Sequence, residues 1–144
     1  MMENYRNDVI VIFAGYPDKM ERFLEKNEGL RSRIAFHVDF PDYNAEELCD
    51  ILKLMSKEKG YTLDEEAEKK CRIIFDCACK NAEFGNGRFV RNVLEQASSK
   101  QSSRIVTECQ NEIYDKKTIS TLSASDFDIN AAKTYKPTRT AIGF

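Results

Sequence analysis

The chain has 144 residues, of which 42% are hydrophobic and 32% charged, and its formal net charge is -2. These proportions are those of an ordinary globular domain. The near-neutral charge gives no electrostatic reason to expect nucleic acid or a membrane as a partner, and no apolar run approaches the roughly 20 residues that span a bilayer. Residues 1–8 are polar and charged rather than a secretory signal, so we expect a cytoplasmic protein.

The cysteine and histidine content argues against a metal site. Five cysteines are present, and an odd number without a paired CxxC framework fits neither a disulfide scaffold nor a zinc site. His37 is the only histidine, and we interpret it as a strand residue. We expect small, buried, reduced thiols and no metal ligands. The cysteines are Cys49, Cys71, Cys77, Cys79 and Cys109.

The first 40 residues predict a strand, a helix and a second strand. The continuous β-branched and aromatic run Val9–Ala14 is typical of a strand that is buried on both faces. Lys19–Lys26 predicts a short helix, and Gly29 is a natural stop after it. Ala35–Phe40 alternates apolar with polar residues, which predicts a strand with one wetter face.

From Asn44 onward the pattern is helical. Asn44 is a good N-cap and Glu47 lies three residues later, which predicts a capping box. Asp64 caps a second helix. Apolar residues at helical spacing predict the inward faces of these two helices, with Leu48, Ile51, Leu52 and Met55 in the first and Ala67, Cys71, Ile74, Phe75 and Ala78 in the second.

A third, longer helix is predicted from about Arg88 to Glu108, followed by a short helix near Ser125–Ala132 that Ser125 or Asp126 caps. The fold class is therefore mainly α with a small α/β part at the N-terminus. We expect three parts, residues 1–42, residues 43–132 and a loose tail over 133–144. The residues predicted to face inward on the third helix are Val90, Val93, Leu94, Ala97 and Ile105.

Two segments carry arginine next to glycine. Arg31 and Arg33 flank one serine after a helix, and a loop-borne guanidinium can bind an oxyanion bidentately. The alternative is a solvated arginine or a surface ion pair. In the second segment Gly85 and Gly87 precede Arg88 in the first turn of a helix, where backbone N–H groups favour anions. The alternative there is a turn whose glycines serve geometry alone.

Three segments occur in a specific order: VIVIFAGYPDKM, then GLRSRIAFHVDFPDY, then GNGRFVRNVLEQA. This series resembles the AAA+ ATPases of the branch that holds the CbbX-like red-type Rubisco activases and stage V sporulation protein K. The resemblance covers roughly Met2 to Phe127. It implies the C-terminal part of such a protein, in which a helical lid of about four helices follows a strand, a helix and a strand.

The resemblance also implies roles for single residues. GLRSRI is similar to the arginine-finger segment, which reaches the γ-phosphate in a neighbouring subunit, and Arg33 fits the motif better than Arg31. GNGR is similar to sensor 2, which contacts nucleotide in its own subunit. At the tip of the sensor 1 strand, where most members have a polar residue such as Asn, this chain departs with Ala-Gly-Tyr. The implied catalytic residues are therefore Arg33 and Arg31, and the implied nucleotide-binding residues are Arg88, Gly85, Gly87 and Tyr16.

The chain contains neither a GxxxxGK[ST] phosphate loop nor an apolar strand ending in Asp-Glu. We therefore expect it to be part of a longer protein and to bind no cofactor and hydrolyse no ATP alone. The parent is expected to use ATP and Mg²⁺, to form a homo-oligomer (a hexamer) and to remodel an unknown protein client. The alternative is a non-catalytic helical protein-interaction module. Without a central strand, residues 1–40 are expected to be rearranged, partly disordered or used in self-association.

Overall fold

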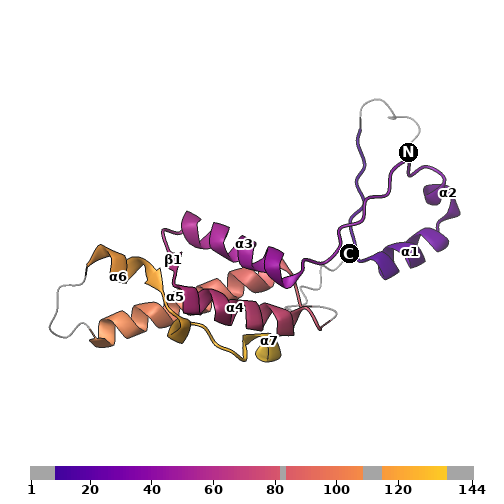
Figure 1. The fold of residues 1–144 in the computed structure, drawn as a ribbon. Helices are drawn as coiled ribbons and strands as arrows, with labels where there is room; N and C mark the ends of the chain where they lie inside the picture. The colour runs from indigo at the N-terminus through magenta and orange to yellow at the C-terminus, as the bar shows by residue number, and fades with distance from the viewer. Residues whose placement is uncertain (1–8, 82–83, 109–114, 136–144) are drawn as a thin grey trace. The chain divides into compact units, whose positions relative to one another are not determined.

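The computed structural model describes residues 9–81, 84–108 and 115–135. The chain divides into two compact units, residues 1–40 and residues 41–144, and each is described here by itself. Several sequence predictions lie outside the described residues: the character of residues 1–8, the thiol of Cys109 and the tail from residue 136 onward. Figure 1 shows the order of the elements along the chain.

The first unit contains two short helices, α1 (Pro17–Glu25) and α2 (Glu28–Arg31). Asn27 separates them, because its side-chain amide donates a 2.8 Å hydrogen bond to the carbonyl of Phe23. The expectation that Gly29 stops the first helix is therefore wrong: α1 ends at Glu25, and Gly29 lies inside α2. Leu24 is buried, and the rings of Phe13 and Phe23 pack 5.9 Å apart.

The two strands predicted in this unit are not formed in the described part of the chain. Residues 9–14 and 35–40 form no strand, and their apolar side chains, which were expected to be buried, are exposed. Ile10 and Phe40 are 89% and 90% exposed. A residue pattern supplies only the preference for extended backbone; a strand also needs a neighbour to complete its hydrogen-bond ladder, and the described residues of this unit provide none.

The second unit is helical, as predicted, and its first two helices begin where their caps were expected. Helix α3 (Ala45–Glu58) has a complete capping box: the Asn44 carboxamide oxygen accepts from the amides of Glu46 and Glu47, and the Glu47 carboxylate accepts from the amide of Asn44. Helix α4 (Glu65–Ala78) begins at Asp64, whose carboxylate accepts from the amide of Ala67 at 2.7 Å.

Helix α5 (Gly87–Glu108) is the longest element of the described chain, and the helical segments after it differ from the one short helix that was predicted. They are α6 (Lys116–Ser120), the 3-10 helix η1 (Ala124–Asp126) and α7 (Ala131–Thr134). The single helix expected near Ser125–Ala132 is thus two separate turns, and its predicted cap is wrong. Ser123 caps η1 instead, in a capping box with Asp126.

Two short strands went unpredicted. Strands β1 (Thr62–Leu63) and β2 (Thr121–Leu122) pair in parallel, with Thr62 opposite Thr121 and Leu63 opposite Leu122. Two residues are too few for an alternating pattern to be visible in the sequence. Their pairing ties the segment after α5 to the segment between α3 and α4.

Helix α3 packs against both α4 and α5, and α4 also contacts η1 and α7. The inward faces were predicted well: the apolar residues expected on α4 are all buried, whereas Ile51 and Met55 on α3 and Ile105 on α5 are only partly buried. The core of this unit is formed by Ala45, Leu48, Leu52, Ala67, Cys71, Ile74, Phe75, Ala78, Phe84, Phe89, Val90, Val93, Leu94, Ala97, Leu122, Phe127, Ala131 and Ala132.

Polar contacts fix the segment after α5 onto the bundle. Asp126 is 2% exposed, and its carboxylate accepts two hydrogen bonds from the Arg104 guanidinium, at 3.0 and 2.9 Å, and one from the Ser123 amide at 2.9 Å. Gln101 is also buried and donates to the carbonyl of Ile119. Burial alone would raise the pKa of the Asp126 carboxyl, but the hydrogen bonds from Arg104 and Ser123 outweigh it and hold that pKa below its usual value.

We predict that Arg104→Ala lowers the free energy of unfolding by about 2–3 kcal/mol, because it leaves a buried carboxylate without its cation. Urea denaturation measures the change, with Arg72→Ala as the control. Arg72 forms an ion pair with Glu46 in which both side chains are largely exposed, and its loss should cost less than about 1 kcal/mol.

The ion pair between Arg104 and Asp126 predicts that the free energy of unfolding depends on pH. Because the folded-state pKa of Asp126 is lowered, the stabilisation by its ionised carboxylate is present above the ordinary aspartate pKa of about 3.9. That stabilisation is lost as the pH falls through the lowered value. Equal costs for Arg104→Ala and Arg72→Ala at neutral pH would contradict this account.

Candidate functional site

The two arginines of the first unit lie at the end of α2. Arg31 is its last residue, Arg33 follows in the turn, and both side chains are exposed. The Arg33 guanidinium bends back toward α2, where its Nη1 donates to the carbonyl of Gly29 at 2.9 Å. The two candidates therefore differ: this hydrogen bond holds the Arg33 side chain near its own backbone, whereas Arg31 is the last residue of helix α2.

Tyr16 also belongs to the first unit. It is the N-cap residue of α1, it is 68% exposed, and the Lys19 ammonium lies 5.3 Å from the centre of its ring. An exposed ring at a helix start can stack on a base or another ring, and the Lys19 charge makes a weak cation–π contact with it.

In the second unit, the residues predicted for sensor 2 lie together in one bend before α5. Gly85 has φ 86° and Asn86 has φ 48°, so the chain passes through the left-handed region twice before the helix begins. Arg88 lies in the first turn of α5 and is exposed. That turn contains no acidic residue, and within the described ranges no carboxylate forms an ion pair with Arg88. One guanidinium thus lies at the N-terminal end of a helix, where the helix dipole favours an anion.

Aromatic packing fixes the position of this turn. Phe89, the residue after Arg88, is 1% exposed, and its ring meets those of Phe75, Phe84 and Tyr135 edge-on with centroids 6.1, 6.3 and 5.0 Å away. Because successive helix residues point about 100° apart, burying Phe89 turns Arg88 away from the core.

The two glycines of the bend have different surroundings. A methyl group at Gly85 would lie 2.6 Å from the Tyr135 hydroxyl, whereas a methyl group at Gly87 would meet nothing within 4 Å. The Tyr135 hydroxyl is itself buried and has no hydrogen-bond partner among the described residues. Gly85 is thus required both for its backbone conformation and for the close approach of Tyr135, whereas Gly87 is required for neither.

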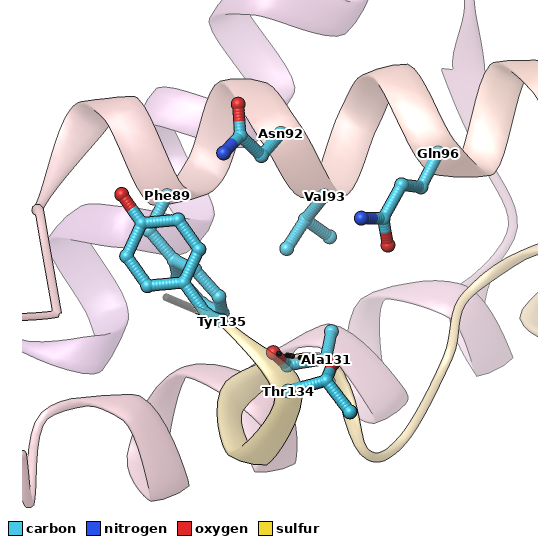
Figure 2. Close-up of a pocket in the computed structure, with 7 residues that line it drawn as sticks. All are labelled: Phe89, Asn92, Val93, Gln96, Ala131, Thr134 and Tyr135. Carbon is cyan, nitrogen blue, oxygen red and sulfur yellow. Dashed lines mark hydrogen bonds between the residues drawn. The ribbon is translucent and has the colours of Figure 1, made fainter. Parts of the chain in front are cut away.

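A cavity of about 280 Å³ lies beside α5, next to this bend (Figure 2). Figure 2 shows α5 side chains on one side of it and residues of α7 on the other, with the Tyr135 ring beside Phe89. No charged side chain lines the cavity, so it is poorly suited to a phosphate. Its lining residues are Phe89, Asn92, Val93, Gln96, Ala131, Thr134 and Tyr135.

The cysteines are only partly as predicted. Cys71 is buried, but Cys49 and Cys77 are partly exposed and Cys79 is exposed, which corrects the expectation of uniformly buried thiols. Cys49 and Cys71 line a second cavity of about 190 Å³, and burial raises the pKa of both thiols. Thiols with raised pKa values are weak nucleophiles at neutral pH. Within the described chain, no group of three acidic, histidine or cysteine side chains is arranged to hold a metal ion.

The sequence profile of the AAA lid domain matches residues 44–137, which include the whole described helical bundle. The chain belongs to the AAA+ family. It corresponds to the C-terminal part of a CbbX-like AAA+ ATPase, as the sequence analysis predicted.

Named relatives support this assignment. The chain is 44% identical over 126 residues to the protein CfxQ homolog of Pyropia yezoensis, covering 88% of this chain and 42% of the relative. It is 39% identical over 136 residues to the protein CbbX of Cereibacter sphaeroides, covering 94% and 43%. It is 48% identical over 105 residues to the chloroplastic ribulose bisphosphate carboxylase/oxygenase activase of Cyanidioschyzon merolae, covering 73% and 36%. The chain thus spans less than half the length of these relatives.

Sequence reasoning missed three residues of this site, namely Asn86, Phe89 and Tyr135. The Asn-Gly dipeptide before the helix was a signal for left-handed backbone at position 86. For Tyr135 the sequence carried no signal, because it contacts Gly85 only through the tertiary fold.

None of the described helices is both long enough and apolar enough to cross a membrane.

We predict that Gly85→Ala lowers the free energy of unfolding by about 2–4 kcal/mol, which is the sum of left-handed strain and a clash with Tyr135. Gly60→Ala is the matched control, because Gly60 has φ 78° with nothing within 4 Å, and it should cost only about 1–2 kcal/mol. Urea denaturation measures both variants. Tyr135→Phe should remove part of the Gly85→Ala cost; equal costs for the two glycine variants would refute the proposed close contact.

Proposed function

We propose that this chain supplies the arginine finger and sensor 2 of a ring-forming AAA+ ATPase that remodels a protein client. The observation that carries the proposal is the exposed Arg88 in a first turn of α5 that contains no acidic residue, within a chain that belongs to the AAA+ family. Residues 43–132 form the lid in this proposal, residues 1–42 belong to the α/β part, and residues 133–144 form a tail.

In this proposal Arg88 contacts the nucleotide of its own subunit. A guanidinium in the first turn of a helix binds phosphate oxygens by charge and by paired hydrogen bonds, and the helix dipole favours an anion there. Gly85 supplies the left-handed backbone conformation that directs the chain into α5. Gly87 has no side chain to cover the backbone before Arg88. Tyr16, whose ring is exposed, is a further nucleotide-binding residue in this proposal.

Arg33, with Arg31 as the second candidate, reaches the γ-phosphate of a neighbouring subunit in this proposal. Both are exposed next to a turn, so either side chain can extend outward. Extending Arg33 requires it to exchange the hydrogen bond to the Gly29 carbonyl for one to phosphate oxygen. The present bond joins the cation to a neutral carbonyl, whereas a phosphate oxygen is anionic and can bind the guanidinium bidentately, which favours the exchange.

The cofactors in this proposal are ATP and Mg²⁺, whose phosphate-loop and metal-binding residues belong to the remainder of the parent protein. The described residues fit the anionic part of the group through Arg88, but they offer no cluster of oxygen ligands for Mg²⁺. Bound Mg-ATP supplies the phosphoryl group and the metal charge, and this chain's arginines would neutralise charge on the phosphates. The parent would act in the cytoplasm as a homo-oligomer, a hexamer in our proposal, on a protein client.

The test uses a hybrid in which this chain replaces the aligned segment of the Cereibacter sphaeroides relative. The alignment covers 94% of this chain. Arg33→Ala in the hybrid is predicted to reduce ATP hydrolysis by about 10³ to 10⁵ while ATP still binds, because a finger acts on the transition state. The matched control is Arg22→Ala, another exposed arginine of the first unit.

Subunit mixing decides whether Arg33 acts between subunits. An Arg33→Ala hybrid mixed with a hybrid that lacks its phosphate-loop lysine should regain activity, because one subunit supplies the loop and its neighbour supplies the arginine. Arg88→Ala should not be rescued in the same way, since its proposed contact is within one subunit. Normal hydrolysis by Arg33→Ala together with inactive Arg31→Ala would transfer the role to Arg31; full activity of both variants would refute the finger assignment.

A further inference from the structure

The chain that leads into the helical bundle, Pro41–Asn44, is fastened to the bend before α5 by the side chain of Asn86. The Asn86 amide nitrogen donates to the Asp42 carboxylate at 2.6 Å, and its carbonyl oxygen accepts from the Tyr43 amide at 2.9 Å. One carboxamide thus uses both of its functions on two consecutive residues that lie more than 40 positions away in the sequence. We call Pro41–Asn44 the lead-in segment.

The backbone at position 86 shows that this side chain is not incidental. Asn86 has φ 48°, a conformation in which glycine is favoured and asparagine is among the few tolerated alternatives. Both of its neighbours in sequence are glycines. A third glycine would satisfy the bend at lower backbone cost, so the geometry of the bend alone does not explain the asparagine. Its two hydrogen bonds to the lead-in segment do.

Two further contacts make the lead-in segment part of the bundle. The Cys79 thiol, at the C-terminal end of α4, donates to the Tyr43 carbonyl at 3.5 Å. Asn44 is the N-cap of α3 and exchanges hydrogen bonds with Glu47. Tyr43 is therefore held through its amide by the bend before α5 and through its carbonyl by the end of α4. The lead-in segment touches three helix ends, and the side-chain hydrogen bonds of Asn86 connect it to the turn that carries Arg88.

We propose that Asn86 is a positioning residue, which joins the lead-in segment to the first turn of α5 so that Asp42, Tyr43 and Arg88 move together. A displacement of the chain at residues 41–44 is then transmitted to the Arg88 guanidinium, and an anion held by Arg88 restrains the lead-in segment in return. The proposal rests on the nucleotide contact proposed for Arg88. The hydrogen-bonded connection itself does not depend on that contact and is tested separately.

The first experiment measures amide hydrogen exchange in the 144-residue chain. Asn86→Gly keeps the left-handed backbone and removes the side chain, so exchange at the Tyr43 amide should become about fivefold faster, the factor that one hydrogen bond contributes. Amides of residues 90–97 should exchange as before, which separates a lost connection from general unfolding. Asn81→Gly, a substitution at an exposed asparagine between α4 and the bend, is the control. An unchanged Tyr43 amide in Asn86→Gly would overturn the proposal.

The second experiment measures ATP affinity in the hybrid, with Arg91→Ala as the control on the same helix. Arg88→Ala should weaken binding by about tenfold, as expected for a charged hydrogen bond, and Asn86→Gly by a smaller factor. The double variant should be no weaker than Arg88→Ala alone, because Asn86 acts through Arg88. A purely structural role for Asn86 would instead make the two losses multiply, and that result overturns the proposal. If Arg88→Ala binds ATP normally, the proposed function fails, and Tyr43 exchange still decides the role of Asn86.

Discussion

The ring of Phe89 makes the contact on which the helical lid most depends. Three rings from separate segments meet it edge-on: Phe75 from α4, Phe84 from the bend and Tyr135 from the end of α7. Such pairs contribute about 0.5–1.5 kcal/mol each beyond the area that they bury. Because these contacts join the start of α5 to both the middle and the end of the lid, they fix the orientation of the first turn of α5. Arg88, the residue before Phe89 in the same turn, is oriented by these contacts in consequence.

The bend before α5 is constrained from two sides, which explains its composition. Tyr135 packs so closely on Gly85 that no side chain fits there, and Asn86 holds the lead-in segment through two hydrogen bonds. The C-terminal helix of the lid and the chain that enters the lid therefore meet at the same few residues. The turn that carries Arg88 is therefore held by contacts to both ends of the lid. Such preorganisation would favour a fixed contact between the guanidinium and a phosphate.

The elements that the sequence predicted best are those determined by local physics. Asn44 and Asp64 cap their helices as expected, since a cap depends only on residues within one turn. The spacing of the apolar residues in α4 likewise predicted which face of that helix is buried. The mainly helical class and the family followed from these helices and from the order of three motifs.

The predictions that failed depended on distant partners. Residues 9–14 and 35–40 have the composition of strands, but a ladder requires a neighbouring strand that their own sequence cannot supply. Gly29 was read as a stop because the hydrogen bond from Asn27 to Phe23 was not foreseen. In the candidate site, the glycines and Arg88 were visible as a motif, whereas the Tyr135 contact and the Asn86 connection join residues more than 40 positions apart.

The central claim is that the lid folds around α5 with a hydrophobic core of its own, independently of the first unit. Hydrogen exchange of the whole chain, followed residue by residue, tests this most directly. The account predicts slow exchange at residues 48–55 of α3 and 90–97 of α5, where the side chains form the core, and fast exchange at residues 9–14 and 34–40, which form no ladder. Fast exchange throughout both helical segments would contradict the claim that these residues form an independently folded lid.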